Sequence, residues 1–405
     1  MQSLKIFIID PSHFTFPYDH HLAQALANRG HEVMLVGRQF RANEERPDMQ
    51  YMHAPVFYAL SERLMVLQGR NLLILVVKGI EHIFNVIHCY RLIIKQKPDI
   101  IHVQWSPLPW IDGFMLRCIR SIPILYTIHD SNLFHNEQAS WLQRVGYRKF
   151  LNHAEAIIFH THFSKNEFFG NEYSKEVDRI QERKLIFQQL IAVIPHGILS
   201  SFCRRPQYGP DKTVWIPHEK IKRIVFFGTL KKYKGIETLI RAFGSIPPDV
   251  RKDAELVIAG EARTSLGRLI ALAREVDISS KCQFIPRRLS ECEIDDLLHG
   301  AWLVVFPHSE CDVSGALLRA LPFGKPIIAS RVGGFVDLFE PLLSHHLFPS
   351  GDYKKLGELM SALLSNDDLY KNFVERTIAL NDRISSWDQI ANMTEELYLR
   401  CINKQ

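Results

Sequence analysis

Two glycine-containing turns carry the most promising chemistry in this 405-residue sequence. The first turn, residues 228–235, has the sequence GTLKKYKG and follows an apolar run that is typical of a buried parallel strand. A glycine turn lets a ligand approach the backbone, and Lys231 and Lys234 can neutralise an anion held at the start of the next helix. In the second turn, Ser314 and Gly315 open another apolar helical pattern. Two such features within one domain predict a diphosphate site.

The stretch 303–339 brings two strand ends and two helix starts together. Its apolar run Leu303–Phe306 predicts a buried strand, and the polar loop after it carries Glu310, Cys311 and Asp312. A second strand and a Gly-Gly turn into another helix follow. Ligands of parallel α/β sheets bind over the carboxyl ends of the strands, where helix N-termini favour phosphate. We therefore expect the ligand at this edge.

A histidine occupies the same kind of position in the N-terminal half. His129 follows the apolar run 122–128, which predicts a strand. Its side chain is then expected at the ligand edge of a sheet. A structural histidine, satisfied by neighbouring backbone, fits this spacing equally well.

The first predicted strand, residues 5–10, leads into a loop rich in aromatic and polar side chains, residues 12–18. Asp19 is a plausible N-cap of the helix predicted over 19–27. The loop lacks the GxGxxG fingerprint of dinucleotide-binding proteins, which argues against a dehydrogenase.

Strands and helices alternate through most of the chain, which is too long for one ordinary core. This alternation predicts an α/β fold of two Rossmann-like, doubly wound domains that face each other across a cleft. We expect an N-terminal domain over 1–200, a linker over 201–222, a C-terminal domain over 223–385, and a helix over 386–405 that packs back towards the N-terminal domain.

The composition is that of a globular protein with a mild basic bias. A net charge of +5 and a pI near 8.7 suit anionic substrates or an anionic membrane surface and are too weak to indicate nucleic acid. The seven scattered cysteines contain no CxxC pair and indicate reduced thiols of a cytosolic protein. The N-terminus enters a strand at once, so we expect no signal peptide. Because Lys78 interrupts the most apolar segment, 72–77, we also expect no transmembrane run.

Residues 57–96 predict a long helical region that mixes apolar and basic side chains. One interpretation is a pair of core helices with solvated basic flanks. The other is a basic amphipathic surface that docks on an anionic bilayer, with Arg63, Arg70 and Lys78 beside an apolar face. We therefore expect a cytoplasmic protein, with peripheral association at the inner face of the membrane as the second interpretation.

Several of these segments together resemble the GT-B glycosyltransferases of family 4, the glycosyl transferases of group 1. That family transfers sugars with retention from nucleotide-sugar donors. The similarity covers nearly the whole chain and is greatest to the branch with an FFGxIRxYKG phosphate turn and a donor loop that ends in SG. The segments that carry it are VIPHG (193–197), FFGTLKKYKG (226–235), AELVIAGEA (254–262), FPHSECDVSGALLRALPFGKPIIAS (306–330), GG (333–334) and SW (386–387).

The resemblance implies roles for individual residues. Lys234 matches the lysine that holds the donor diphosphate, and Lys231 stands where that branch often has arginine. His129 matches the histidine that contacts the transferred sugar, and Tyr18 and Asp19 lie where acceptor or phosphate contacts are expected. The positions expected to line the donor are Gly228, Thr229, Glu310, Asp312, Ser314, Gly315 and Arg319.

The sequence departs from the family pattern at its paired glutamates. The first falls at Cys311, and the second, usually a ribose ligand, falls at Arg319. Thr229 replaces the common arginine after the turn glycine. We expect Glu310 or Asp312 to supply the missing carboxylate for sugar hydroxyls.

The expected reaction is a retaining, metal-independent transfer from a nucleoside-diphosphate sugar to a glycan, lipid-linked or small-molecule acceptor. Lysine ammonium groups and helix N-termini can stabilise the departing diphosphate without a divalent ion, no DxD pair stands out, and no cofactor is expected. Two alternatives stay open. One is an epimerase or phosphorylase on the same fold, and the other is a non-catalytic subunit of a polysaccharide-assembly complex, which the absent glutamates would suit.

Overall fold

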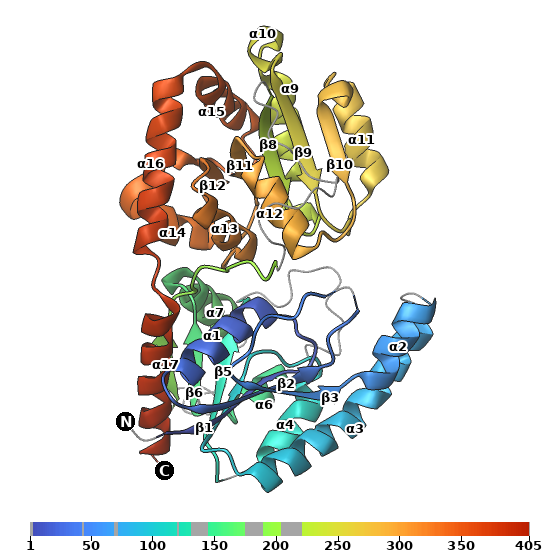
Figure 1. The fold of residues 1–405 in the computed structure, drawn as a ribbon, viewed down its shortest axis with the longest axis vertical. Helices are drawn as coiled ribbons and strands as arrows, with labels where there is room; N and C mark the ends of the chain where they lie inside the picture. Colours follow the sequence, from blue (N-terminus) through green and yellow to red (C-terminus); the bar gives the residue numbers. More distant parts are fainter. Residues whose placement is uncertain are drawn as a thin grey trace. The chain divides into compact units, whose positions relative to one another are not determined.

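The computed structural model describes residues 3–42, 44–68, 72–119, 121–130, 145–174, 189–203 and 221–404. The chain divides into two compact units: residues 1–197 with 385–405, and residues 198–384. Each unit is built on one parallel sheet covered by helices (Figure 1). The predicted α/β fold with two Rossmann-like units is confirmed.

The N-terminal unit holds a seven-stranded parallel sheet in the order β3-β2-β1-β4-β5-β6-β7. Its strands are β1 (Lys5–Asp10), β2 (Glu32–Arg38), β3 (Met52–Phe57), β4 (Ile100–Val103), β5 (Ile124–Ile128), β6 (Ala156–Phe159) and β7 (Leu190–Val193). Its helices are α1 (Phe16–Asn28), α2 (Ala59–Gln68), α3 (Leu72–Gln96), α4 (Pro109–Arg117), α6 (Tyr147–Leu151), α7 (His162–Ser174) and α17 (Trp387–Ile402). The central strands are continuous apolar runs because helices cover both of their faces.

Helix α1 begins three residues before the predicted start. Its first residue is Phe16, and Pro17 follows in the first turn, where a missing N–H costs nothing. Asp19 therefore lies in the first turn and is not the N-cap, and Tyr18 belongs to the helix and not to the loop.

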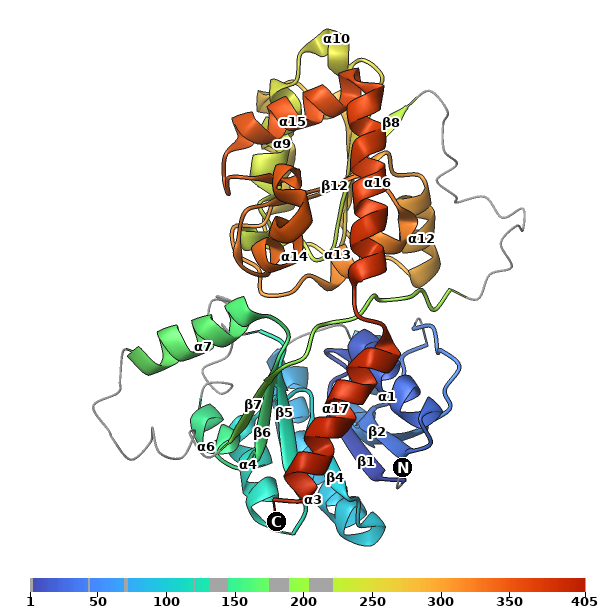
Figure 2. The same cartoon turned by 90° about the vertical axis from the view of Figure 1, so that its left-hand side faces the viewer.

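The last helix, α17, belongs to the N-terminal unit, where it packs along α1 (Figure 2). It starts with a capping box in which the Ser386 side chain accepts the Gln389 N–H and the Gln389 side chain accepts the Ser386 N–H. Residues 198–203 are part of the C-terminal unit, and residues 204–220 of the expected linker lie outside the described residues.

The C-terminal unit holds a six-stranded parallel sheet in the order β10-β9-β8-β11-β12-β13. Its strands are β8 (Lys222–Phe227), β9 (Ala254–Ala259), β10 (Cys282–Ile285), β11 (Leu303–Phe306), β12 (Ile327–Ser330) and β13 (Leu347–Phe348). Its helices are α9 (Ile236–Ser245), α10 (Pro248–Arg251), α11 (Leu266–Glu275), α12 (Glu291–His299), α13 (Gly315–Ala320), α14 (Gly333–Leu343), α15 (Tyr353–Ser365) and α16 (Asp367–Arg383), with short 3-10 turns η1 (Lys232–Lys234), η2 (Ser279–Lys281), η3 (Leu321–Phe323) and η4 (Ser344–His346).

The region predicted to be helical from residue 57 onwards holds α2 and α3. One side of α3 packs on the sheet, whereas most of its other apolar side chains are exposed. By length and composition, α3 could cross a membrane: its most apolar 18-residue window has a mean hydropathy of 1.6 and is 22% buried. Lys78 therefore does not by itself exclude a span by length and composition, since one lysine is too little to offset the apolar residues around it. Arg70 lies outside the described residues.

The expectation that all seven cysteines are reduced thiols is also wrong. A disulfide joins Cys203 to Cys292 at the start of α12, with 4.9 Å between their Cα atoms. No spacing pattern indicates this bond, because the two residues are 89 positions apart and meet only through the tertiary fold.

Thiol counting tests this bond directly. Alkylation of the unfolded, unreduced protein should modify the five free cysteines, and alkylation after reduction should modify all seven. Intact-mass spectrometry gives both counts. Seven modified thiols without reduction would contradict the disulfide and restore the original expectation.

Candidate functional site

The turn after β8 places two lysines against one aromatic ring. The Nζ atoms of Lys231 and Lys234 lie 5.7 and 5.0 Å from the centroid of the Tyr233 ring. Gly228 precedes them with a φ of 126°, a conformation that L side chains rarely adopt, and Thr229 follows it half-buried. Two ammonium groups are thus gathered at the carboxyl end of a central strand, where parallel sheets bind ligands.

This turn packs directly against the segment after β11. A Cβ atom on Gly235 would lie 1.7 Å from the carbonyl oxygen of Pro307, so only glycine fits there. On the other side, the Cβ position of Gly228 has the Cβ of Ala316 as its neighbour, at 3.9 Å. The start of α13 therefore lies beside the lysine turn, as the sequence predicted for two elements of one phosphate site.

Ser314 caps α13. Its Oγ accepts the N–H of Leu317 at 3.3 Å, and the helix begins at Gly315. In the loop before it, Glu310 and Asp312 are half-buried, and the carbonyl of Cys311 accepts the Gly334 N–H at 2.8 Å. The loop that carries both candidate carboxylates is thereby held against the start of α14.

Arg319 lies on α13 with a buried guanidinium that pairs with Asp295 and, at 3.6 Å, with Glu291 on α12. Its Cζ also lies 5.6 Å from the centroid of the Phe323 ring. The structure thus pairs the Arg319 side chain with α12, whereas the resemblance implied that this side chain contacts the donor.

His308 was not among the candidate residues identified from the sequence; it follows β11 and is 1% exposed. Burial, and the nearby Lys234, hold the pKa of His308 well below its usual value. Its Nδ1 has no hydrogen-bond partner among the described residues. Its position two residues after a buried strand is the signal that could have identified it.

In the N-terminal unit, the carboxyl ends of four neighbouring strands gather polar side chains. Gln104, His129 and His160 directly follow β4, β5 and β6, and His196 follows β7. Because these strands are consecutive in the sheet, the four side chains form a row along its edge. Only His129 was identified from the sequence.

Hydrogen bonds connect this row. His129 Nδ1 lies 3.1 Å from His160 Nε2, and His160 Nδ1 lies 3.0 Å from the carbonyl oxygen of Ile194. A carbonyl oxygen can only accept, so His160 carries its proton on Nδ1, and a neutral His160 accepts the Nδ1–H of His129 at Nε2. The Gln104 amide lies 2.8 Å from the other nitrogen of His129, Nε2.

The orientation of that amide decides the charge of the row. If the Gln104 oxygen faces His129, the ring must donate from both nitrogens, and the histidine pair carries a proton; if the amide is turned over, the pair is neutral. Burial, followed by the charges of His160 and His196, holds the pKa of His129 well below its usual value. The structure places the Gln104 oxygen towards His129 Nε2 and the amide nitrogen 3.3 Å from His102 Nε2, so a neutral His129 requires the amide to be turned over.

Tyr18 packs into this row from α1. Its ring centroid lies 5.0 Å from that of His129, 4.9 Å from those of His160 and His196, and 5.2 Å from that of Trp387 on α17. The Tyr18 hydroxyl is buried and has no hydrogen-bond partner among the described residues. A buried hydroxyl without a partner is costly, which makes it a candidate contact for a bound polar molecule. Tyr18 and His129 are therefore brought together as one cluster.

Asp19 belongs to a different cluster. Both of its carboxylate oxygens lie within 3.2 Å of the Thr15 hydroxyl, and Asp10 accepts the Thr15 N–H at 2.8 Å. Burial and the neighbouring Asp10 raise the pKa of Asp19 well above its usual value. Asp19 is thus a fully buried carboxyl group beside Asp10, and through Thr15 it serves the start of α1.

The buried histidines predict acid-sensitive stability for the N-terminal unit. Burial lowers the pKa of His13 to about 2, of His20, His102 and His196 to about 3, and of His53 and His160 to about 4. Between these values and 6.5 the unfolded chain binds protons that the folded chain does not, so stability falls as pH falls.

Asp10, Asp19 and Glu155 oppose this trend because their pKa values are raised, but they are outnumbered by the six histidines above and by His129, whose pKa is also lowered. We expect the first melting transition in scanning fluorimetry to drop by about 5 °C or more between about pH 7 and about pH 5. The drop should be smaller in His160→Gln. A transition that rises over this range would contradict the account.

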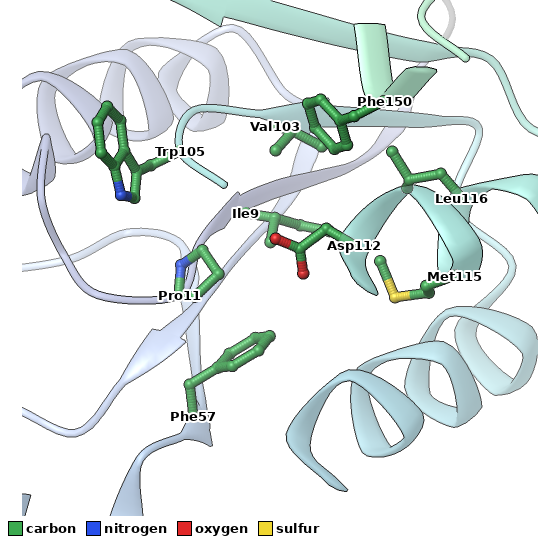
Figure 3. Close-up of a pocket in the computed structure, with 9 residues that line it drawn as sticks. All are labelled: Ile9, Pro11, Phe57, Val103, Trp105, Asp112, Met115, Leu116 and Phe150. Atoms are coloured by element: carbon green, nitrogen blue, oxygen red, sulfur yellow. The ribbon is translucent and has the colours of Figure 1, made fainter. Parts of the chain in front are cut away.

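A small pocket in the N-terminal unit does not fit a sugar. It is lined by Ile9, Pro11, Phe57, Val103, Trp105, Asp112, Met115, Leu116 and Phe150 (Figure 3). Its acid, Asp112, already accepts from the Ser106 hydroxyl and lies 2.9 Å from His82 Nε2. Sugar sites need several polar groups pointing inward, which this apolar lining does not offer. Within the described part of the chain, no three His, Cys, Asp or Glu side chains are grouped to hold a metal ion.

Two family models match the chain. The model for Glycosyltransferase Family 4 matches residues 18–181, and the model for Glycosyl transferases group 1 matches residues 211–379. Between them they cover most of both units.

Curated relatives are distant. A D-inositol 3-phosphate glycosyltransferase of Corynebacterium diphtheriae is 23% identical over 58% of this chain, and the match spans about half, 55%, of that protein. An N-acetyl-alpha-D-glucosaminyl L-malate synthase of Bacillus anthracis is 21% identical over 88% of this chain and 85% of its own length. The first name describes a sugar transfer, and the second describes the synthesis of a sugar joined to L-malate. The two names therefore give different acceptors.

Solved structures share the fold. HepE of Anabaena, in complex with UDP and glucose, has a TM-score of 0.69 at 15% identity and covers 98% of this chain and 100% of its own. A sucrose-phosphate synthase from Thermosynechococcus elongatus has a TM-score of 0.67 at 17% identity and covers 99% of each chain. With both domain models matched in chain order on two Rossmann-like units, this protein belongs to the GT-B glycosyltransferases of family 4, the group 1 glycosyl transferases, and is a glycosyltransferase.

Proposed function

We propose that the protein transfers a sugar from a nucleoside-diphosphate sugar to an acceptor hydroxyl, with retention and without a divalent metal. The observation that carries this proposal is the pair of lysines, Lys231 and Lys234, on one ring beside the start of α13. In the reaction the bond between sugar C1 and the diphosphate oxygen breaks, and its electron pair stays on that oxygen. The acceptor oxygen bonds to C1 on the same face, and its proton passes to the departing diphosphate. Fixed positive charge stabilises that diphosphate.

The N-terminal unit supplies the second part of the proposal. We assign His129 to the transferred sugar and the Tyr18 hydroxyl to a polar group of the donor sugar or acceptor. The partnerless Tyr18 hydroxyl and the hydrogen-bonded His129 ring support these roles. The full burial of Asp19 and its hydrogen bonds with the Thr15 hydroxyl support a structural role at the start of α1 better than a direct acceptor contact.

For the donor nucleotide we favour UDP, on the strength of the fold shared with HepE, whose structures are complexes with UDP and UDP-glucose. The acceptor class is a glycan, a lipid-linked sugar or a small molecule. Glu310 and Asp312 remain the proposed replacements for the family's sugar-binding carboxylate, because their loop is held at α14 beside the lysine turn. Arg319 is proposed to alter the ribose end of the site through its pairing with α12.

Ligand-induced stabilisation tests the proposal. A panel of UDP, GDP, ADP and TDP in a thermal-shift assay should show one nucleotide that raises the melting temperature, because a ligand of the folded state stabilises it by mass action. Transfer from the matching radiolabelled sugar nucleotide, with and without EDTA, then tests sugar transfer and the absence of a metal. No stabilisation by any of the four nucleotides would argue against a functional donor site.

We also propose a cytoplasmic location at an anionic membrane surface. The mild basic charge of the chain and the exposed apolar side of α3 support this partner.

A further inference from the structure

The outward side of α3 carries an unusually large exposed apolar surface. Spacings of three and four residues align the exposed apolar side chains of α3, apart from Leu75, as one stripe along the helix. The exposed apolar residues of α3 are Leu72, Leu73, Leu75, Val76, Ile80, Ile83, Phe84, Ile87 and Ile94, with exposed fractions between 41% and 78%. Contiguous apolar patches of this kind mark interaction sites, since scattered single residues would need no explanation.

Helix α4 extends this surface. Trp110 is 48% exposed and Phe114 is 71% exposed, and their spacing of four residues puts them on one side of the helix. Side chains of α3 and α4 both enter the core cluster on the same side of the sheet, so their outward sides face the same way. We call this combined surface, made of the α3 stripe with Trp110 and Phe114, the α3–α4 surface.

We infer that the α3–α4 surface docks in the interface of an anionic bilayer, with α3 lying in the plane of the membrane and not crossing it. This inference rests on the membrane partner of the proposed function, and it names the surface, its orientation and the lipid charge. It does not depend on the proposed chemistry.

The charges around the stripe suit anionic lipid. Among residues 59–65 and 72–117, the exposed basic side chains are Arg63, Arg91, Lys95, Lys97 and Arg117, and Asp99 is the exposed acid. Asp99 accepts the N–H of Lys5, and the other acids of these segments are occupied within the unit. Long basic side chains can keep their heads in the headgroup layer while their stems cover apolar surface.

The opposite side of α3 excludes a spanning helix. His82 lies there, fully buried, 2.9 Å from Asp112 and 2.7 Å from the Tyr58 hydroxyl. Lys78 forms an ion pair with Glu62 at 3.0 Å. A spanning α3 would have to leave these partners and carry their polar groups into hydrocarbon, whereas an in-plane α3 keeps them all.

A second copy of the chain fits the surface less well. In a two-fold interface built on this stripe, Arg91 would be buried within the apolar contact. The nearest acid on α3, Glu81, already accepts the N–H groups of Leu60 and Ser61. A buried arginine without a carboxylate is costly, whereas at a bilayer surface Arg91 can reach lipid phosphates.

Vesicle flotation of the full-length protein tests the inference. The protein should float with vesicles of equal parts phosphatidylcholine and phosphatidylglycerol, and much less with phosphatidylcholine alone or at high salt. The double variant Ile80→Glu, Phe84→Glu should lower the bound fraction at least about tenfold, because it removes two large apolar side chains from the contact. Arg91→Gln with Lys95→Gln should lower binding to the anionic vesicles only.

Ile378→Glu is the matched control. This residue is 46% exposed on helix α16 of the other unit, so its replacement puts the same acidic side chain at an exposed apolar position without touching the α3–α4 surface. Flotation that is absent on both vesicle types, or unchanged in the Ile80 and Phe84 variant, would overturn the inference. So would a dimer in light scattering that the same variant dissociates without lipid. Nucleotide thermal shifts on each variant show separately whether the donor site is intact.

Discussion

Replacement of Lys234 by alanine should lower kcat by about 10²–10³-fold while the protein stays folded. Its ammonium lies 5.0 Å from the Tyr233 ring, at the turn that ends the central strand β8 and packs against the start of α13. A charge fixed there stabilises the departing diphosphate more than the bound donor, so the loss should appear in kcat as well as in kcat/KM. Steady-state kinetics with the nucleotide sugar that stabilises the protein measures both.

Lys232→Ala provides the matched control. Lys232 lies in the same short turn and carries the same charge, but it is exposed to solvent. Its replacement should change turnover less than about threefold, since an exposed charge is screened by water and salt. Equal losses in the two variants would indicate a general electrostatic effect, and near wild-type turnover in Lys234→Ala would defeat the assignment of the diphosphate site.

The second large effect is expected at His129. Replacement by alanine should lower kcat by about 10²–10³-fold, because it removes a positioned group proposed to contact the transferred sugar. The thermal shift produced by the donor nucleotide should remain, since the proposed nucleotide contacts lie in the C-terminal unit. Single-turnover kinetics measures the loss in the chemical step, and the thermal shift with the nucleotide measures donor binding separately.

His160 is a positioning residue in the same row. Its Nε2 accepts from His129 in the neutral row, and its Nδ1 is fixed on the Ile194 carbonyl. His160→Ala should cost about tenfold or more, because a loosened His129 ring is misplaced. His160→Gln, whose amide oxygen can accept in place of Nε2, should recover part of that loss. His162→Ala, at an exposed histidine two residues on, is the control. If His160→Gln is as impaired as His160→Ala, the positioning role is wrong.

Several parts of the fold could be predicted from the sequence because residues close together in the chain determine them. Runs such as Leu303–Phe306 are too apolar for any place except the centre of a parallel sheet, and the structure forms that strand over the same residues. The need for glycine in the lysine turn could be predicted in the same way. Gly228 has a φ of 126°, and Gly235 leaves no room for a side chain beside Pro307. The helix at residue 16 began earlier than predicted because Pro17, and not Asp19, determines its first turn.

Other parts could not be predicted from the sequence because the order of the strands in the sheet and the packing of the helices determine them. The histidines at 129, 160 and 196 are widely separated in sequence and meet because β5, β6 and β7 are neighbours. The disulfide from Cys203 to Cys292 has the same origin. Arg319 was expected to face the donor, and its pairing with α12 depends on how two helices pack.

By itself, the sequence determined the family, the α/β units and the strand ends at which chemistry would occur, because apolar runs and glycine turns act over a few residues. The tertiary structure decided which side chains share a hydrogen bond and which side of α3 is left exposed. Those properties depend on contacts between residues far apart in the chain, and no short pattern encodes them.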